Sequence, residues 1–264
     1  MSEKIVIKNK ALKVFITGAT SGIGESLAHQ YAKEGATLGL VGRRLELLTK
    51  LKSNIKTDCE IYAVDVTAQK KLEKAANHFI KKYGPPDIVI ANAGVSTGTL
   101  AGEKKDLDTF KRVIEINLFG VIHTFLPFIE VYKKKKSGQL VGIASVAGIR
   151  GLPGSGAYST SKAALINYLE SLRIEMKPFG IYVTTIAPGY IHTPMTQHNR
   201  YTMPFILDVD DAVSCFMKAI RNKKCFVIIP WQMKIVGTIM KFLPAPLWDF
   251  LAKGGPKKIR KMIQ

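Results

Sequence analysis

Tyr158 and Lys162 have the spacing that proton transfer to a small molecule would need. They lie four residues apart in a stretch of helical periodicity, so both project from one helix face and can contact the same ligand. A phenol has a pKa of about 10 and is a slow acid near neutral pH, but a lysine ammonium ~4 Å away stabilises its phenolate by ~4 kcal/mol at an effective dielectric constant of about 20. The pair therefore indicates protonation of an alkoxide, as after hydride transfer to a carbonyl carbon.

The surroundings of Tyr158 distinguish it from a chance match. Ser145 lies at the carboxyl end of a predicted strand, the edge where open parallel sheets bind ligands, and can donate a hydrogen bond to a substrate oxygen. A second Tyr-x-x-x-Lys match, Tyr132 with Lys136, falls in the lysine run 133–136 and has no such serine before it. We interpret the second match as a solvated helix end and use it as an internal control.

A glycine-rich turn follows the first predicted strand and precedes a helix. It reads Thr17-Gly18-Ala19-Thr20-Ser21-Gly22-Ile23-Gly24, which is G-x-x-x-G-x-G rather than the commoner G-x-G-x-x-G. Gly18 permits a tight turn, Gly22 lets the backbone approach a pyrophosphate, and Gly24 lets the helix pack closely. Because a helix N-terminus attracts anions, the turn predicts a dinucleotide site.

The end of the second predicted strand indicates which dinucleotide is bound. An acidic side chain there suits the ribose 2′-hydroxyl of NAD, whereas an arginine suits the 2′-phosphate of NADP. Gly42 supplies no carboxylate and Arg43 supplies a fork of donors. We therefore expect NADP(H) to be favoured over NAD(H). Arg44 fits equally well as the exposed start of a helix.

Short β-branched runs alternate with amphipathic stretches along the whole chain. This order predicts one α/β domain, residues 1–264, with a Rossmann-type doubly wound parallel sheet of seven strands. The expected strands are Val14–Thr17, Thr37–Val41, Glu60–Ala63, Asp87–Ala91, Gln139–Ala144, Ile181–Ala187 and Cys225–Ile229. The expected helices are Ile23–Glu34, Leu45–Asn54, Ala68–Lys82, Asp108–Lys134, Ala157–Lys177 and Asp210–Arg221.

Together these motifs resemble a short-chain dehydrogenase/reductase of the common single-domain type, in order and at family spacing from about Lys13 to Ile229. The resemblance rests on the glycine turn, Asp65-Val66, Asn92-Ala93-Gly94, Asn117, Ser145, Tyr158-x-x-x-Lys162 and Pro188-Gly189 through Thr193. It implies an NADP(H)-dependent oxidoreductase whose catalytic residues are Asn117, Ser145, Tyr158 and Lys162. In that role Lys162 also holds the nicotinamide ribose, and Asn117 anchors a water that links Lys162 to solvent.

The resemblance also implies a set of cofactor-binding residues. Asp65 and Val66 would meet the adenine, residues 92–94 would line the nucleotide, and Ile191 with Thr193 would approach the nicotinamide. The full expected set is Gly18, Thr20, Ser21, Gly22, Ile23, Gly24, Arg43, Asp65, Val66, Asn92, Ala93, Gly94, Tyr158, Lys162, Pro188, Gly189, Ile191 and Thr193.

Residues 194–209 form an expected substrate lid rich in apolar side chains, including Met195, Tyr201 and Phe205. Such a set suits a hydrophobic alcohol or ketone, and it equally suits a lid that packs on its own core. The helices 108–134 and 157–177 have more apolar surface than one sheet should cover, and the family resemblance implies that they pack into a homodimer or homotetramer.

The chain is strongly basic, with 39 Lys and Arg against 20 Asp and Glu and a formal net charge of +19. No recognised nucleic-acid module is present, so we expect no nucleic-acid partner. Residues 231–264 form an amphipathic extension that is split by Pro244 and Pro246 and ends in basic residues. This extension either closes the pocket or an oligomer interface, or attaches the protein peripherally to an anionic bilayer.

Several other classes are disfavoured. The basic tail 1–12 lacks the apolar core of a signal peptide, and three cysteines without C-x-x-C argue against disulfides and structural zinc. The histidines lack metal-ligand spacing, so we expect no metal, and the stretch 233–251 is too interrupted to span a membrane. Gly94–Gly98 matches the nucleophile elbow of serine hydrolases around Ser96, but no apolar helical pattern follows.

The sequence thus favours a cytoplasmic carbonyl or alcohol oxidoreductase acting on a small molecule. Two alternatives remain open at this point. One is a non-catalytic NADP(H)-binding sensor or scaffold protein, and the other is a reductase that acts on lipid ketones at a membrane surface.

Overall fold

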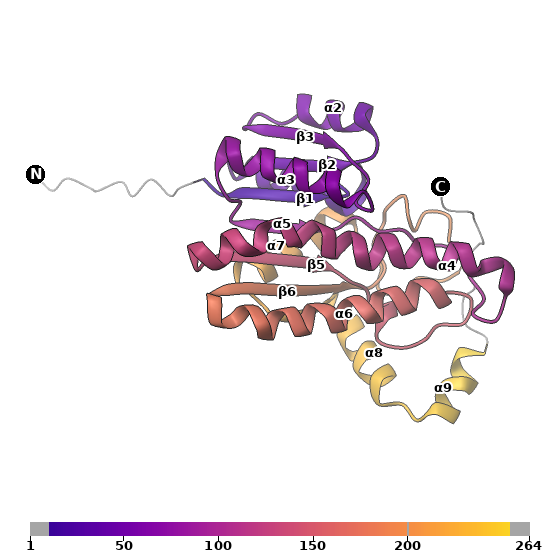
Figure 1. The fold of residues 1–264 in the computed structure, drawn as a ribbon. Coiled ribbons are helices and arrows are strands. Elements are labelled where there is room, and N and C mark those ends of the chain that lie inside the picture. The colour runs from indigo at the N-terminus through magenta and orange to yellow at the C-terminus, as the bar shows by residue number, and fades with distance from the viewer. Residues whose placement is uncertain (1–10, 200, 254–264) are drawn as a thin grey trace, which may run out of the picture.

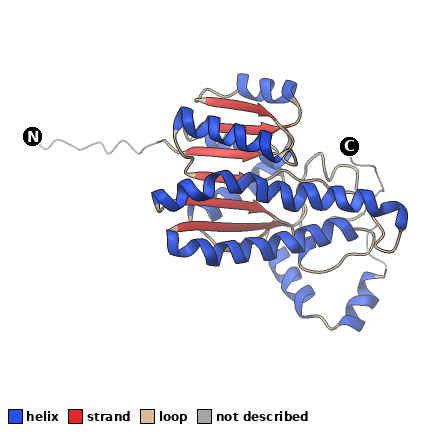
Figure 2. Cartoon of the chain, viewed as in Figure 1, coloured by secondary structure: helices blue, strands red, loops and turns tan. Residues whose placement is uncertain are grey.

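Seven parallel strands form the centre of the structure, a computed structural model that describes residues 11–199 and 201–253 (Figure 2). Their order in the sheet is β3-β2-β1-β4-β5-β6-β7 (Figure 1). Each predicted strand is confirmed, with its ends within one residue of the prediction. The strands are β1 (Lys13–Thr17), β2 (Thr37–Gly42), β3 (Cys59–Ala63), β4 (Ile88–Ala91), β5 (Gly138–Ile143), β6 (Ile181–Pro188) and β7 (Phe226–Ile229).

Helices cover both faces of this sheet. On one face Leu27, Leu48 and Phe216 pack in one core cluster, and on the other Leu72, Phe125 and Leu165 pack in a second. The first layer contains α1 (Gly22–Lys33), α2 (Leu45–Ser53) and α7 (Val209–Arg221). The second contains α3 (Gln69–Tyr83), α4 (Leu107–Ile114), α5 (Gly120–Lys135) and α6 (Gly156–Met176). The described part of the chain also contains short 3-10 helices, which are η1 (Lys104–Asp106), η3 (Val146–Gly148) and η4 (Lys177–Phe179).

The long helix expected over 108–134 is present, but it is not uniform. A π-helical segment, η2 (Glu115–Phe119), separates α4 from α5 and carries Asn117 at its centre. Such π segments are rare and are often found at functional sites. By length and hydropathy the run Lys104–Lys135 could also cross a membrane, but core helices pass the same test, and Phe125 and Phe128 are fully buried here.

The interpretation of Tyr132 as part of a solvated helix end is wrong. Its side chain is fully buried, its ring fills the space above Gly138, and its hydroxyl has no hydrogen-bond partner in the described part of the chain. Phe125, Phe128 and Tyr132 recur at helical spacing on the face of α5 that packs on the sheet, and this apolar period outweighs the lysines that follow. Tyr132 is a core residue.

The C-terminal extension forms two helices, α8 (Trp231–Phe242) and α9 (Ala245–Ala252), with the turn at Leu243–Pro244 between them. Figure 1 shows them in yellow, extending away from the sheet on the side opposite β3. The basic residues Lys257, Lys258, Arg260 and Lys261, and most of the predicted tail 1–12, lie outside the described residues.

The tight packing of Phe15 on β1 gives a prediction for stability. Its ring lies 5.6 Å from that of Phe79 and 5.1 Å from that of Phe128, measured between centroids. A Cβ at Gly39 would lie 2.5 Å from Phe15 and 2.8 Å from Phe79. We expect Gly39→Ala to lower the free energy of unfolding by about 1–3 kcal/mol because it overpacks this cluster.

Chemical denaturation followed by circular dichroism measures this effect. Gly102→Ala is the control, since a Cβ there would meet no atom within 4 Å, and it should change the free energy of unfolding by less than about 0.5 kcal/mol. Equal midpoints for the two variants would contradict the packing argument.

Candidate active site

The carboxyl ends of the central strands surround a cavity of about 400 Å³. This is the edge of a parallel sheet at which ligands bind. Of the site residues expected from the sequence, Gly24 and Asn117 do not line the cavity. Those that do are Gly18, Thr20, Ser21, Gly22, Ile23, Arg43, Asp65, Val66, Asn92, Ala93, Gly94, Ser145, Tyr158, Lys162, Pro188, Gly189, Ile191 and Thr193.

The glycine turn between β1 and α1 depends on backbone conformations that other residues rarely adopt. Gly18 and Gly22 have φ angles of 69° and 56°, in the left-handed region that glycine enters without strain. The side-chain amide of Asn92 donates hydrogen bonds to the carbonyl oxygens of Thr17 at 3.2 Å and Gly18 at 3.1 Å. Asn92 therefore holds the turn in shape, while Gly24 lets α1 approach the Gly18 carbonyl closely.

Two arginines lie at the end of β2, beside the glycine turn. Arg44 Nη2 donates hydrogen bonds to Thr20 Oγ1 at 2.7 Å and to Ser21 Oγ at 3.1 Å. A Cβ at Gly42 would lie only 2.6 Å from Thr20 Cγ2. The sequence left the role of Arg44 open, and the structure shows that it contacts the turn and lines the cavity together with Arg43.

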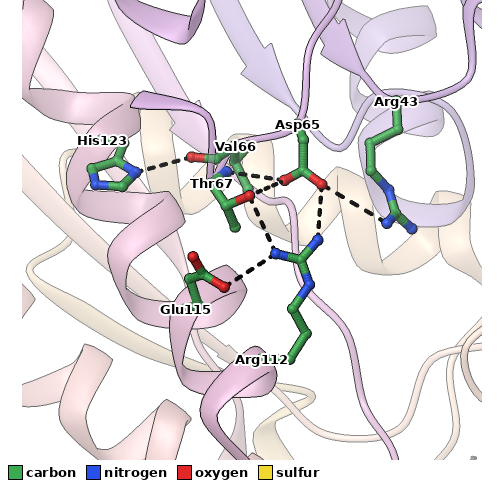
Figure 3. A network of polar contacts seen from close by, with 7 residues as sticks. All are labelled: Arg43, Asp65, Val66, Thr67, Arg112, Glu115 and His123. Atoms are coloured by element: carbon green, nitrogen blue, oxygen red, sulfur yellow. Dashed lines mark hydrogen bonds and ion pairs between the residues drawn. The ribbon is translucent and has the colours of Figure 1, made fainter. Parts of the chain in front are cut away.

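Asp65, which lines the same cavity, is the centre of a polar network (Figure 3). Its Oδ1 accepts hydrogen bonds from the backbone N–H and the hydroxyl of Thr67, both at 2.9 Å. Its Oδ2 lies 3.1 Å from Arg112 Nη2 and 3.9 Å from Arg43 Nη1. Arg112 also pairs with Glu115 at 3.2 Å. The carboxylate is thus fixed in orientation from two sides.

The ionised form of Asp65 is favoured overall. Burial opposes ionisation, but the two Thr67 hydrogen bonds and the charges of Arg112 and Arg43 outweigh it, so the pKa of Asp65 lies below its ordinary value. Arg112 is a member of this site that sequence reasoning missed. It lies on α4, 47 residues from Asp65, and no local pattern connects the two.

Asn117 is fully buried and acts as a clamp. Its Nδ2 donates hydrogen bonds to the Val95 carbonyl at 2.9 Å and to Ser161 Oγ at 3.0 Å, and its Oδ1 accepts one from the Val95 N–H at 2.8 Å. It thereby ties the irregular segment that follows β4 to α6. No helix follows Ser96 before η1 begins at Lys104, so this segment lacks the geometry of a nucleophile elbow.

Lys162 and Ser145 both lie next to Tyr158. The Lys162 ammonium is buried, donates a hydrogen bond to the Ile143 carbonyl at 2.7 Å, and lies 5.9 Å from the centre of the Tyr158 ring. Ser145 Oγ accepts a hydrogen bond from the Ala147 N–H at 3.2 Å. These contacts gather three of the four expected catalytic residues on one wall of the cavity.

The acidity of Tyr158 differs from the sequence-based expectation. Burial raises the pKa of the phenol, and a hydrogen bond with Ser145 offsets only part of that effect. Desolvation is the larger of these two effects, so the pKa of the Tyr158 phenol lies above its ordinary value rather than below it. Burial thus favours the neutral phenol, which is the form that can donate a proton.

The expected lid leaves the body at β6 and returns to it before α7. The His192 N–H donates to the Leu207 carbonyl at 2.9 Å and the Leu207 N–H to the Tyr190 carbonyl at 3.1 Å, so the two ends of the lid lie side by side. Tyr201 packs edge-on against Tyr190 at 6.2 Å. Burial, with Tyr190 and Tyr158 nearby, raises the pKa of Tyr201 to about 12. Met195, which lines the cavity, is 46% exposed.

Comparison with known proteins agrees with this geometry. Residues 12–204 match the family model described as short chain dehydrogenase. An uncharacterized oxidoreductase of Myxococcus xanthus is 35% identical over 241 residues, which cover 90% of this chain and 95% of that protein.

Solved structures share the fold at lower identity. ElxO with NADP bound has a TM-score of 0.75 at 24% identity and covers 83% of this chain and 97% of its own. NAD+-bound xylitol dehydrogenase has a TM-score of 0.75 at 23% identity and covers 84% and 98%. The extent of the family match decides the assignment: this chain belongs to the short-chain dehydrogenase/reductase family and is an oxidoreductase that acts on CH–OH groups.

Proposed function

We propose that this protein is an NADP(H)-dependent oxidoreductase that interconverts a carbonyl and a secondary alcohol on a hydrophobic small molecule. The observation that carries the proposal is the convergence of Ser145, Tyr158 and Lys162 on the same cavity as the glycine turn. We expect it to work in the cytoplasm, where the three free cysteines, Cys59, Cys215 and Cys225, stay reduced.

The residues around the cavity fit a nicotinamide dinucleotide. Gly18 and Gly22 leave two positions of the turn without a side chain, the N-terminus of α1 favours a pyrophosphate, and Asp65 presents a fixed carboxylate for an adenine. When bound, the reduced nicotinamide supplies the hydride. Ile191, Thr193 and Lys162 would lie on the side of the nicotinamide and its ribose, as the family resemblance implies.

Proton transfer is the task of this chain's own side chains. Ser145 would donate a hydrogen bond to the substrate oxygen, and Tyr158 would give its proton to that oxygen as the alkoxide forms. The resulting phenolate would be stabilised by the buried Lys162 ammonium, because the attraction between the two charges is stronger where the dielectric constant is low. In the oxidation direction the same groups act in reverse, with Tyr158 as the base.

The preference for NADP(H) is supported by the charges at the end of β2. Arg43 and Arg44 both line the cavity at the end of β2, where a 2′-phosphate would bind, and the Thr20 hydroxyl there accepts a hydrogen bond from Arg44. No carboxylate lies at the end of β2, because Gly42 is its last residue and Arg43 follows it. Arg112 pairs with Asp65 at 3.1 Å and Arg43 at 3.9 Å, so Arg112 is the nearer of the two cations to this carboxylate. An arginine beside the cavity can bind a phosphate with two parallel hydrogen bonds.

We predict that NADPH binds more tightly than NADH and that Arg43→Asp narrows or inverts this preference. The substitution removes a phosphate-binding cation and adds a repelling carboxylate, so the ratio of the two dissociation constants should fall by at least about tenfold. Fluorescence titration of each cofactor measures it. Lys50→Asp makes the same charge change on the exposed side of α2 and should leave the ratio unchanged. Equal or better NADH binding by the unmodified protein would refute the preference.

We predict that Tyr158→Phe retains NADPH binding and lowers kcat by about 100-fold or more, because it removes the transferable proton and little volume. Tyr132→Phe is the control: it removes a buried hydroxyl without a partner among the described residues, so turnover should be unchanged. Ketones and alcohols screened with NADPH or NADP+ give the readout. Equal effects of the two changes would mean that Tyr158 has no special role, and NADPH binding without any turnover would favour the sensor or scaffold alternative.

We also expect self-association through the long helical run of α4, η2 and α5. Phe119 and Leu126 are seven residues apart on this run, on one helix face, and are 48% and 47% exposed. We predict a dimer or tetramer by light scattering at micromolar concentration, and a shift to monomer in the double variant Phe119→Glu/Leu126→Glu, because two charges would then be desolvated at the contact. A monomeric unmodified protein would count against this.

A further inference from the structure

The α8–α9 hairpin, residues 231–252, presents an apolar surface that nothing in the described structure covers. On α8, Met233 and Gly237 are buried against the body of the protein. A Cβ added at Gly237 would lie only 2.6 Å from Ile149 Cδ1, so α8 packs closely there. The opposite face of α8 and the outer side of α9 carry large apolar side chains that are exposed. These are Trp231, Ile235, Ile239, Phe242, Leu247, Phe250 and Leu251, which we call the outer stripe.

The degree of exposure sets the outer stripe apart from scattered surface residues. Trp231 is 69% exposed, Phe242 76% and Phe250 77%. On α8 the members recur at intervals of three or four residues, so they form one continuous face rather than isolated positions. Contiguous apolar surface of this kind marks a contact site for a partner or a membrane.

The hairpin is not a loose tail, because it is fixed to the body by polar contacts. Arg150 Nη1 donates hydrogen bonds to the carbonyl oxygens of Met240, at 2.8 Å, and Leu243. The Arg150 guanidinium lies 5.3 Å from the Trp248 ring centre, and Trp248 Nε1 donates to the Gly151 carbonyl at 3.3 Å. The outer stripe is therefore held in place, projecting from the segment that connects Ser145 to Tyr158.

Charge decides what covers the outer stripe. Lys234 and Lys241 are exposed along one flank of α8, and Lys253 follows α9, whereas Asp249 is the one acidic residue between Trp231 and Gln264. A two-fold contact between copies would bring both sets of lysines into one interface, with only Asp249 from each copy to balance them, which opposes association. An apolar face bordered by cations is instead complementary to a bilayer with anionic headgroups, since the acyl region takes the aromatic side chains and the headgroups take the lysines.

We propose that the α8–α9 hairpin docks this protein on the surface of an anionic lipid bilayer, with the outer stripe inserted at the headgroup boundary and Lys234 and Lys241 on the headgroups. This goes beyond the proposed oxidoreductase activity and does not depend on it. Docking would place the loop between Ser145 and Tyr158, through Arg150 and Trp248, next to the lipid surface.

Sedimentation of the full-length protein with vesicles tests the docking. The probes are vesicles of phosphatidylcholine alone and of an equimolar mixture with phosphatidylglycerol, each at low and at high salt. We expect binding to the mixed vesicles at low salt and weaker binding at high salt or without phosphatidylglycerol. Absence of binding to the mixed vesicles at low salt would overturn the proposal.

Substitutions of exposed residues separate the contribution of the apolar side chains to vesicle binding from that of the lysines. Phe242→Ser/Phe250→Ser should lower the partition coefficient by at least about 100-fold, and Lys234→Gln/Lys241→Gln by about tenfold or more on the mixed vesicles only. Phe226→Ser, an exposed aromatic at the start of β7, is the matched control and should change nothing. Circular dichroism, measured in parallel, shows that each variant is folded.

Two outcomes would contradict the assignment. If Phe242→Ser/Phe250→Ser sediments as well as the unmodified protein, the outer stripe is not the membrane contact. If the same variant instead converts an oligomer to a smaller species in light scattering and the unmodified protein ignores the vesicles, a second copy of the chain is the occupant.

Discussion

The buried ammonium of Lys162 is the constraint on which the arrangement of the site depends. A charged amine removed from water must be hydrogen-bonded, and the Ile143 carbonyl at the end of β5 supplies one such bond. This hydrogen bond requires the backbone that follows β5 to pack closely against the backbone of α6. A Cβ at Gly148 would lie 2.6 Å from the Lys162 carbonyl carbon, so only glycine lets η3 pack directly on α6. Ser145 shortly precedes Gly148 in the chain, and Tyr158 shortly precedes Lys162. The contact between η3 and α6 therefore brings Ser145 and Tyr158 to the same cavity.

Polar side chains fix the loops of this site by joining segments that are distant in sequence. Asn92 ties the end of β4 to the glycine turn, Asn117 ties the following segment to η2 and α6, and Arg112 ties α4 to the loop after β3. Each bond joins a side chain to a backbone group, a hydroxyl or a carboxylate that lies 22 or more residues away in the chain. The loops at the carboxyl edge therefore do not depend on their own sequences alone for their shape.

The difference between local patterns and contacts between distant segments explains what could be predicted from the sequence. Strands and helices follow from local apolar periods, and the strands were predicted to within one residue because buried parallel strands are continuous β-branched runs between turns. Arg44 and Arg112 could not be assigned, since their roles come from contacts across 23 or more residues. Tyr132 was misjudged because the lysines after it gave a stronger local signal than the apolar face to which it belongs.

The closed base of the lid has a consequence for how this protein can change. Because Ile191 and Leu207 are bridged, the intervening loop begins and ends at one point on the body. Loop-closure entropy rises only slowly with loop length, by about 0.6 kcal/mol for each doubling, so longer or shorter insertions there should be well tolerated. New substrate preferences can therefore evolve, or be engineered by grafting lids, while the residues on α6 for which we propose a role in proton transfer are inherited unchanged.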